Sequence, residues 1–491
     1  MDKPVRTYCF VSIATLLVQW LIFRFWFPFP GFYSDSYTYI GAAIDGSAVS
    51  VRPIGYSWFL TAIHAISTSA GLLIFLQYVL IEAAAFWLFL YIRRIFSLPP
   101  KLEWLFYIFL MCNPLSLFVA NSVSSDALFT ALGLCWLLTL LRLVRNPRWS
   151  HIIVLSILLL LVFYVRYNAL CYPVIAAVAF ITTIRRKGWQ FAATGIVVSL
   201  CIVLLGVLLT REATYRRTGT RVFTAFSAWQ IANNALHIYP YIEVDNASLP
   251  GADMQELDRC VKAYFDTAGP RLRAGNPIVT ADYMWNRDSP LKYYYSLIRN
   301  REHSSHFVAW TKVAPLYTRY GYYLILRHPF LFTKYYLLPG TGQFFWPPLE
   351  VLGNFNDAQP TIDLTAQSWF HFASPRVYAR WTALQPIMMS PYRILYLLEN
   401  MLCLLAILHF CLFRNARKRM LAEFPAFSRA WIVVATFFLV NAGFFIYAAA
   451  NFFRYQVIPF LVLMPFICIY VSIALKPKDS ASIPVSMPRS S

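Results

Sequence analysis

Charged side chains stand at the ends of apolar segments in this sequence, where a membrane protein meets water. They include Asp35, Asp126 in "NSVSSDALF", Arg166 in "YVRYNALCYP" and Arg454 in "NFFRYQVIP". An arginine presents a planar fork of donors that suits a phosphate, and a carboxylate can accept a proton from an attacking hydroxyl group. The combination favours chemistry on a lipid phosphate. Each residue taken alone is also typical of a helix cap, a loop acid or an interfacial side chain.

The elements that must position these residues are transmembrane helices. Of 491 residues, 59% are hydrophobic and 13% are charged, whereas about 25% of the residues in a soluble domain are charged. Apolar runs that approach the roughly 20 residues needed to cross a bilayer lie at about 7–28, 71–92, 104–120, 127–144, 151–165, 169–184, 190–209, 394–413, 430–450 and 455–475. The sequence therefore predicts an all-α polytopic membrane protein with about ten transmembrane helices. The first run ends without a small-residue cleavage site, which indicates a retained anchor.

The net charge of +20 is spread over short basic clusters between the apolar runs and not gathered in one basic domain. This distribution is typical of membrane topology, so nucleic acid is not an expected partner. The clusters are Arg93/Arg94/Lys101, Arg142/Arg145/Arg148, Arg185/Arg186/Lys187, Arg414/Arg417/Lys418/Arg419 and Lys476/Lys478. Ten spans with the N-terminus inside would place all of them in the cytoplasm.

This topology requires that residues 54–69, "IGYSWFLTAIHAISTS", do not span the membrane. Their polar residues recur at helical spacing and form a stripe opposite the large apolar ones, with Ser57, Thr61, His64 and Thr68 on one side and Trp58, Phe59, Ile63 and Ile66 on the other. The pattern predicts an amphipathic helix that lies on the outer membrane surface.

The predicted topology divides the chain into four parts. Residues 1–210 form a transmembrane module with the first extracytoplasmic loop and the surface helix, and 211–393 form a mainly helical extracytoplasmic loop domain that includes helical patterns at 251–269 and 327–340. Residues 394–476 supply the C-terminal transmembrane helices, and the Ser- and Pro-rich tail at 477–491 is expected to be disordered and cytoplasmic. The four charged residues named first then converge on the extracytoplasmic face.

The order and sidedness of these motifs resemble the GT-C glycosyltransferases, in particular the family 39-like group of protein O-mannosyltransferases and the aminoarabinose transferase of lipid A. The resemblance rests on "YSDSYTY", on "RPIGYSWFL" with Arg52 and Pro53, on "SSDALF", on "RYNALCYP" and on "RYQVIP". It covers residues 1 to about 210 and 394–476.

The resemblance implies an inverting transfer of a sugar from a polyprenyl-phosphate or polyprenyl-diphosphate donor to a glycan, lipid or protein acceptor. Asp35 would be the catalytic base, and Arg52, Arg166 and Arg454 would bind the donor phosphate. Tyr37, Asp126 and Tyr455 would support the site or bind the acceptor. The expected location is a bacterial inner membrane, with the active site facing the periplasm or exterior.

Two departures from the family pattern leave the cofactor and the acceptor open. Ser36 follows Asp35 where the aminoarabinose transferases have an acid, and the surface helix begins Arg-Pro-Ile instead of Lys-Pro-Pro. A divalent metal is compatible with the sequence but not required by it. A lipid-linked-sugar flippase or transporter, a non-catalytic scaffold for envelope assembly, and an envelope polysaccharide ligase or polymerase are the alternatives.

Overall fold

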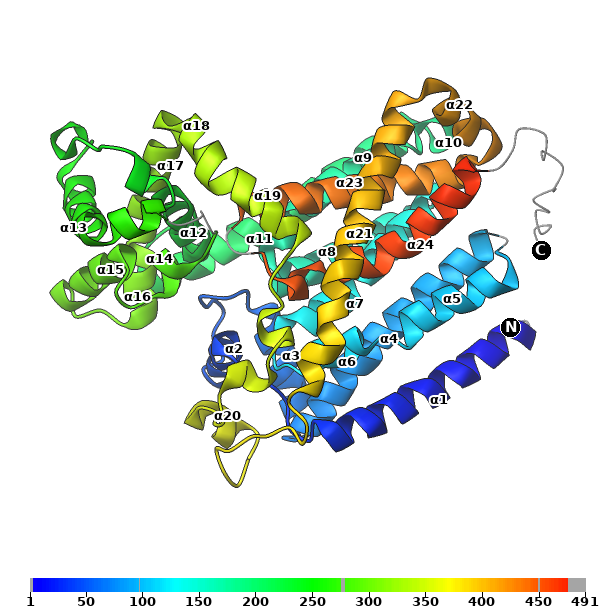
Figure 1. Ribbon diagram of the computed structural model, residues 1–491, viewed down its shortest axis with the longest axis horizontal. Coiled ribbons are helices and arrows are strands. Elements are labelled where there is room, and N and C mark those ends of the chain that lie inside the picture. Colours follow the sequence, from blue (N-terminus) through cyan, green and yellow to red (C-terminus); the bar gives the residue numbers. More distant parts are fainter. Residues whose placement is uncertain (1–2, 97, 275–278, 449–450, 476–491) are drawn as a thin grey trace.

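The computed structural model describes residues 3–96, 98–274, 279–448 and 451–475, and in them the chain folds as a bundle of helices (Figure 1). The helices that are long and apolar enough to cross a membrane are Val5–Trp26 in α1, Ala70–Ile95 (α4), Pro100–Ala120 (α5 and α6), Ser125–Arg145 (α7), Trp189–Thr218 (α11), Leu384–Leu412 (α21), Pro425–Tyr447 (α23) and Phe453–Ala474, which contains α24. The prediction of an all-α polytopic membrane protein is confirmed.

Two further apolar helices occupy the positions of the fifth and sixth predicted spans. They are α8 at Trp149–Val165 and the segment Tyr167–Ile181, which contains α9. Both are shorter than the eight spans above; seventeen helical residues extend about 26 Å, somewhat less than a hydrocarbon core. The count of ten spans therefore stays a prediction. The predicted tail at 477–491 lies outside the described residues.

The segment predicted as a surface helix forms a short helix, α3 (Gly55–His64). Ten residues extend about 15 Å, which is too short to cross a bilayer. The prediction of its polar face is wrong at Ser57, because that side chain is 1% exposed and donates a hydrogen bond to the carbonyl of Tyr39 at 2.9 Å. Trp58, on the predicted apolar side, is 51% exposed. The helix thus packs on the protein through a face that hydropathy alone does not identify.

The long loop divides between two hydrophobic cores. Its first part, from α12 (Ala225–Leu236) to α17 (Ala314–Arg327), packs around the buried side chains of Trp229, Trp310 and Tyr317. The helices between them are α13 (Ala252–Ala274), α14 (Asp282–Trp285), α15 (Pro290–Arg301) and α16 (His306–Lys312). Buried residues between 344 and 377 instead join the core of the bundle. The region expected to be one loop domain, 211–393, therefore contains a separate lobe and a segment that covers the end of the bundle.

The lobe and the basic clusters lie at opposite ends of the bundle (Figure 1). The lobe helices α13 to α16 extend beyond one end, whereas α10 (Ile184–Lys187) and α22 (Arg414–Glu423) lie at the other. These two short helices carry the clusters Arg185/Arg186/Lys187 and Arg414/Arg417/Lys418/Arg419. If these clusters remain in the cytoplasm, the lobe lies on the extracytoplasmic side, and this orientation stays a prediction.

Candidate active site

The first loop is attached to the turn before α7, which brings Asp35 and Asp126 together. The backbone N–H of Gly31 donates to the carbonyl of Asn121 at 2.8 Å, and the N–H of Val123 donates to the carbonyl of Gly31 at 3.0 Å. Helix α2 (Ser34–Ile44) begins directly after this contact. Asp35 stands in its first turn, where the helix dipole favours a carboxylate.

Ser36 has a structural part in this arrangement. Its hydroxyl oxygen accepts a hydrogen bond from the backbone N–H of Tyr33 at 3.1 Å, and the side chain is fully buried. A side chain that reaches back to the residue before a helix satisfies a donor that the helix itself leaves unpaired. The serine that departs from the family pattern therefore fixes the start of α2.

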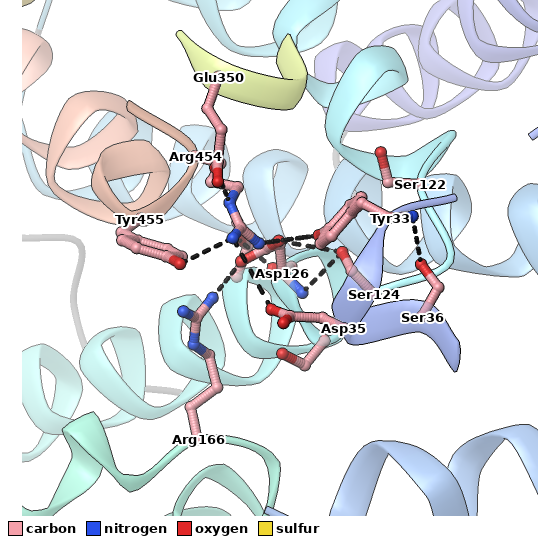
Figure 2. Close-up of polar contacts among 12 residues, drawn as sticks. Tyr33, Asp35, Ser36, Ser122, Ser124, Asp126, Arg166, Glu350, Arg454 and Tyr455 are labelled. Carbon is pink, nitrogen blue, oxygen red and sulfur yellow. Dashed lines mark hydrogen bonds and ion pairs between the residues drawn. The ribbon is translucent and has the colours of Figure 1, made fainter. Parts of the chain in front are cut away.

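Arg454 stands at the centre of the polar cluster (Figure 2). Its Nε donates to Glu350 at 2.6 Å, and its Nη1 donates to the hydroxyl of Tyr33 at 2.8 Å and to Asp126 at 3.0 Å. Its Nη2 donates to the hydroxyl of Tyr455 at 2.8 Å and lies 3.7 Å from a carboxylate oxygen of Asp35. A guanidinium has five N–H groups. Protein side chains thus accept from four of them, and the fifth faces Asp35.

Asp126 is the buried anion beneath this cluster. It is 3% exposed and pairs with Arg166 as well as with Arg454, and the hydroxyl groups of Tyr33 and Ser124 donate to it at 2.9 Å and 3.0 Å. Two cations and two hydroxyl donors compensate the cost of burying a carboxylate. Burial raises the pKa of Tyr33 well above its usual value, so its hydroxyl keeps the proton that it donates.

Arg52 connects the first loop to the lobe. Its Nη2 pairs with Asp35, and its guanidinium carbon lies 4.6 Å from the ring centre of Phe226 in α12 and 5.3 Å from that of Trp285 in α14. An arginine over aromatic faces gains a cation–π attraction of about 0.5–2 kcal/mol. The lobe therefore helps to hold the guanidinium beside Asp35.

A close backbone contact brings Arg52 and Arg166 to the same place. A Cβ atom on Gly55, at the start of α3, would lie 2.7 Å from the backbone carbonyl of Tyr164 at the end of α8. Only glycine permits this approach without displacement of one helix. Arg52 precedes Gly55 by three residues and Arg166 follows Tyr164 by two, so the contact sets the separation of the two arginines.

The polar cluster opens into a cavity of about 580 Å³ between the bundle and the lobe. Asp35, Arg52, Arg166, Glu350, Arg454 and Tyr455 line it on the bundle side. Phe226, Gln230, Thr280 and Trp285 line it on the lobe side, and Phe444, Phe445 and Phe452 add apolar surface near the end of α23. Small-molecule sites typically have volumes of about 300–1,000 Å³, with a few convergent polar groups on a largely apolar wall.

The structure brings all of the predicted site residues except Tyr37 together, although one of them does not line the cavity. Asp35, Arg52, Arg166, Arg454 and Tyr455 all line the cavity, whereas Asp126 lies beneath its wall and is not part of the lining. Tyr37 lies elsewhere, and its hydroxyl accepts from the backbone N–H of Asp363 at 3.4 Å.

The position of Tyr37 follows from helical geometry. Residues two apart on a helix point about 200° apart, so Asp35 and Tyr37 of α2 cannot face the same cavity. Tyr39, four residues after Asp35, lines the cavity, and its hydroxyl donates to Ser125 at 3.0 Å. Helical spacing could have identified this tyrosine from the sequence.

Tyr33 and Glu350 are, besides Tyr39, site residues that sequence reasoning missed. Tyr33 belongs to the same tyrosine cluster as Tyr37, but it precedes helix α2. The centre of its ring lies 4.8 Å from the guanidinium carbon of Arg454. Glu350 stands in the loop, in a short 3-10 turn (Glu350–Leu352) with a backbone φ of +50°. Burial raises the pKa of Glu350, and the nearby Arg454 opposes that shift. No local pattern in the sequence marks this glutamate.

A metal site is not evident in the described part of the chain, where no three His, Cys, Asp or Glu side chains group so as to hold a metal ion. The carboxylates of the cluster pair with arginines instead.

Comparison with known proteins found no matching family model, no matching curated protein and no matching solved structure.

Proposed function

We propose that the protein is an inverting glycosyltransferase that transfers a sugar from a polyprenyl-phosphate or polyprenyl-diphosphate donor to an envelope glycan, lipid or protein acceptor. The observation that carries the proposal is a carboxylate, Asp35, that lines a cavity of about 580 Å³ together with Arg52, Arg166 and Arg454. A base beside phosphate-binding groups, in a cavity at the end of a membrane bundle, suits a lipid-linked donor.

In the proposed reaction, Asp35 accepts the proton of the acceptor hydroxyl as its oxygen attacks the anomeric carbon. The bond between that carbon and the phosphate oxygen breaks, and the phosphate leaves with the electron pair. Attack from the face opposite the leaving group inverts the anomeric centre. The guanidinium groups of Arg52, Arg166 and Arg454 stabilise the negative charge that develops on the leaving phosphate. Such electrostatic stabilisation is typically a large contribution to catalysis.

Arg52 has a second part in the proposal, because it pairs with Asp35 in the structure. This ion pair occupies a carboxylate oxygen that the acceptor hydroxyl would need. A donor phosphate would compete for the same guanidinium and turn it away from Asp35. In the proposal, binding of the donor thus frees Asp35 to accept the proton of the acceptor hydroxyl.

Arg166 is the second arginine assigned to the phosphate. Among the described residues its ion-pair partner is Asp126, which is bound through Nη1 alone. Its guanidinium lies 4.3 Å from the ring centre of Tyr455, which fixes its plane at the cavity wall. A held guanidinium with further N–H groups towards the cavity can donate to two phosphate oxygens.

The test is sugar transfer in membranes that contain the protein, supplied with a panel of radiolabelled polyprenyl-phosphate sugars. The proposal predicts a labelled acceptor with one donor of the panel, and no label in membranes that lack the protein. Labelled donor that crosses the bilayer unchanged, with no labelled acceptor, would contradict it.

Movement of unchanged labelled donor across the bilayer would support a lipid-linked-sugar transporter. One observation favours this alternative. Glu82 in α4 and Glu399 in α21 are buried, at 1% and 2% exposed, inside two spans and away from the cavity lining. Intramembrane carboxyl groups often mark a translocation pathway. The proposed transferase has no use for either glutamate.

A further inference from the structure

The ion-pair cluster of the site has no surplus positive charge. It consists of three carboxylates and three guanidinium groups, those of Asp35, Asp126, Glu350, Arg52, Arg166 and Arg454. Asp282 and Asp357 also line the cavity and add negative charge. An anionic phosphate that enters this cavity would meet a neutral or negative site unless one carboxylate gives up its charge.

Arg454 has little donor capacity left in this state. Its Nε has a single N–H, which donates to Glu350 at 2.6 Å. Loss of the charge on Glu350 would weaken that bond and release the N–H towards the cavity, which Arg454 and Glu350 both line. Protonation of one glutamate would therefore supply both the missing charge and a phosphate donor.

Glu350 is better placed than the other carboxylates to change its charge. Asp126 pairs with two arginines and accepts from two hydroxyl groups, and Asp35 pairs with both Arg52 and Arg454, whereas Glu350 pairs with Arg454 alone among the described residues. Burial raises the pKa of Glu350. Its backbone φ of +50° is uncommon for a residue with a side chain and frequently accompanies a functional position.

The charged groups that face Glu350 come from several elements. Arg454 and Tyr455 stand at the start of the last span, Asp35 in α2 and Asp126 in α7, and Asp357 follows in the next turn of the loop. Helix α21 packs against the Glu350 turn through Gln385, whose amide donates to the carbonyl of Val351 at 2.8 Å. Asp35 and Asp126 favour protonation of Glu350, and Arg454 opposes it.

We propose that Glu350 takes up a proton when an anionic lipid phosphate binds, so that Arg454 can donate to the phosphate group. The inference rests on the proposed function, because it needs that class of ligand. The carboxylate gains one proton from solvent, the hydrogen bond from the Nε–H of Arg454 to Glu350 breaks, and the same N–H donates to a phosphate oxygen. Affinity then decreases as the pH rises above the pKa of Glu350, by up to about tenfold per pH unit.

The test is calorimetric binding of a polyprenyl methyl phosphate to the full chain in lipid nanodiscs. This phosphodiester is a suitable probe because its single negative charge does not change between about pH 5 and about pH 9, so the ligand itself takes up no proton. Titration in buffers with different ionisation enthalpies counts the protons taken up. The wild type is expected to take up about one proton per ligand at about pH 8, where an ordinary glutamate is fully ionised.

Three variants assign the proton. Glu350→Gln should bind about tenfold more tightly at about pH 8, without proton uptake and without pH dependence, because it carries the neutral form permanently. Glu302→Gln, outside the cavity, is the matched control and should behave as the wild type. Asp357→Asn tests the other carboxyl near Arg454 and should keep the uptake.

The outcomes separate this inference from the proposed function. Binding without proton uptake in the wild type, or uptake that persists in Glu350→Gln or disappears in Asp357→Asn, would overturn the assignment to Glu350 and leave the proposed function standing. Absence of binding by the wild type at every pH would contradict both. The count in the wild type requires no variant to fold.

Discussion

The guanidinium of Arg454 donates to four side chains from separate parts of the chain. Tyr33 comes from the first loop, Asp126 from the start of α7, Glu350 from the long loop, and Tyr455 is its neighbour. Arg454 therefore holds both carboxylates and hydroxyl groups of the site in place, in addition to any contact with phosphate. Buried polar networks of this kind specify a geometry only when every member is satisfied.

Substitution of Arg454 tests this part of the site. Arg454→Ala leaves Asp126 with one fewer cation in a buried position, and breaking a buried pair typically costs about 3–5 kcal/mol of stability. Arg454→Lys keeps the charge, but an ammonium group cannot reach four partners in a planar fork, so we expect partial recovery. Thermal unfolding in detergent gives the order of stability, with wild type above Lys and Lys above Ala. A Lys variant as stable as the wild type would show that charge alone suffices.

Residue types and the predicted topology were enough to place Asp35, Asp126, Arg166 and Arg454 at one end of the bundle. Arg52 was expected from the resemblance to the GT-C glycosyltransferases, and the structure pairs it with Asp35. Glu350 could not be found in this way, because it reaches Arg454 from a loop of low periodicity, and its pKa is raised by burial and by Asp35 and Asp126, which only the fold brings near it. Tyr37 was expected from the same resemblance, whereas helical phase brings Tyr39 to the cavity.

At the scale of elements, α3 is positioned by backbone contact. Gly55 of α3 lies against the carbonyl of Tyr164, and the hydroxyl of Tyr56 donates to the side chain of Gln77 in α4 at 2.6 Å. The amide of Gln77 in turn donates to the carbonyl of Ala120 at 2.7 Å. These contacts fix α3 to α4 and to the turn before α7. Arg52, which lies just before α3, is fixed with them.

Gly55→Ala tests this contact. The added methyl group would lie 2.7 Å from backbone atoms that cannot rotate away, so α3 must shift, at a cost of about 1–3 kcal/mol. We expect a lower unfolding temperature and weaker phosphodiester binding through displacement of Arg52. Gly41→Ala in α2 is the matched control, because its Cβ would have no atom within 4 Å. Equal behaviour of the two variants would exclude the close approach of α3 and α8.

Hydropathy predicted the bundle well and the surface helix less well. Each span of the structure falls on a predicted apolar run, because crossing a bilayer demands length and apolarity whatever the tertiary contacts. The face of α3 depends instead on its neighbours, and Ser57 is buried because it can donate to the carbonyl of Tyr39. The split of the long loop between two cores likewise depends on long-range packing.

At the scale of the whole molecule, the bundle has a basic end and an end that carries the lobe and the cavity (Figure 1). Retention of basic loops in the cytoplasm would place the cavity on the extracytoplasmic side. A lipid-linked donor could then present its headgroup to Arg52 and Arg166 from the membrane boundary. The same orientation of the bundle would place the acceptor on the extracytoplasmic side of the membrane.

Cysteine labelling tests this orientation. A cysteine introduced at Ser67, after α3, should react with an impermeant reagent added outside intact cells. A cysteine at Ser150, in the first turn of α8 beside the cluster that ends at Arg148, is the matched control and should react only after the membrane is opened. The native cysteines give the background, measured in the wild type. The reverse pattern would place the cavity in the cytoplasm.

Turnover of Asp35→Asn, measured with the donor identified from the panel, tests whether Asp35 is the base of a sugar transferase. Loss of a general base typically costs about 10²–10⁴ in rate, while asparagine keeps the shape of the side chain. We expect a loss of this size in the rate of labelled-sugar transfer, with an unfolding temperature close to that of the wild type and phosphodiester binding that is at least as tight, because Arg52 loses its competing carboxylate. Transfer at the wild-type rate by this variant would contradict the account.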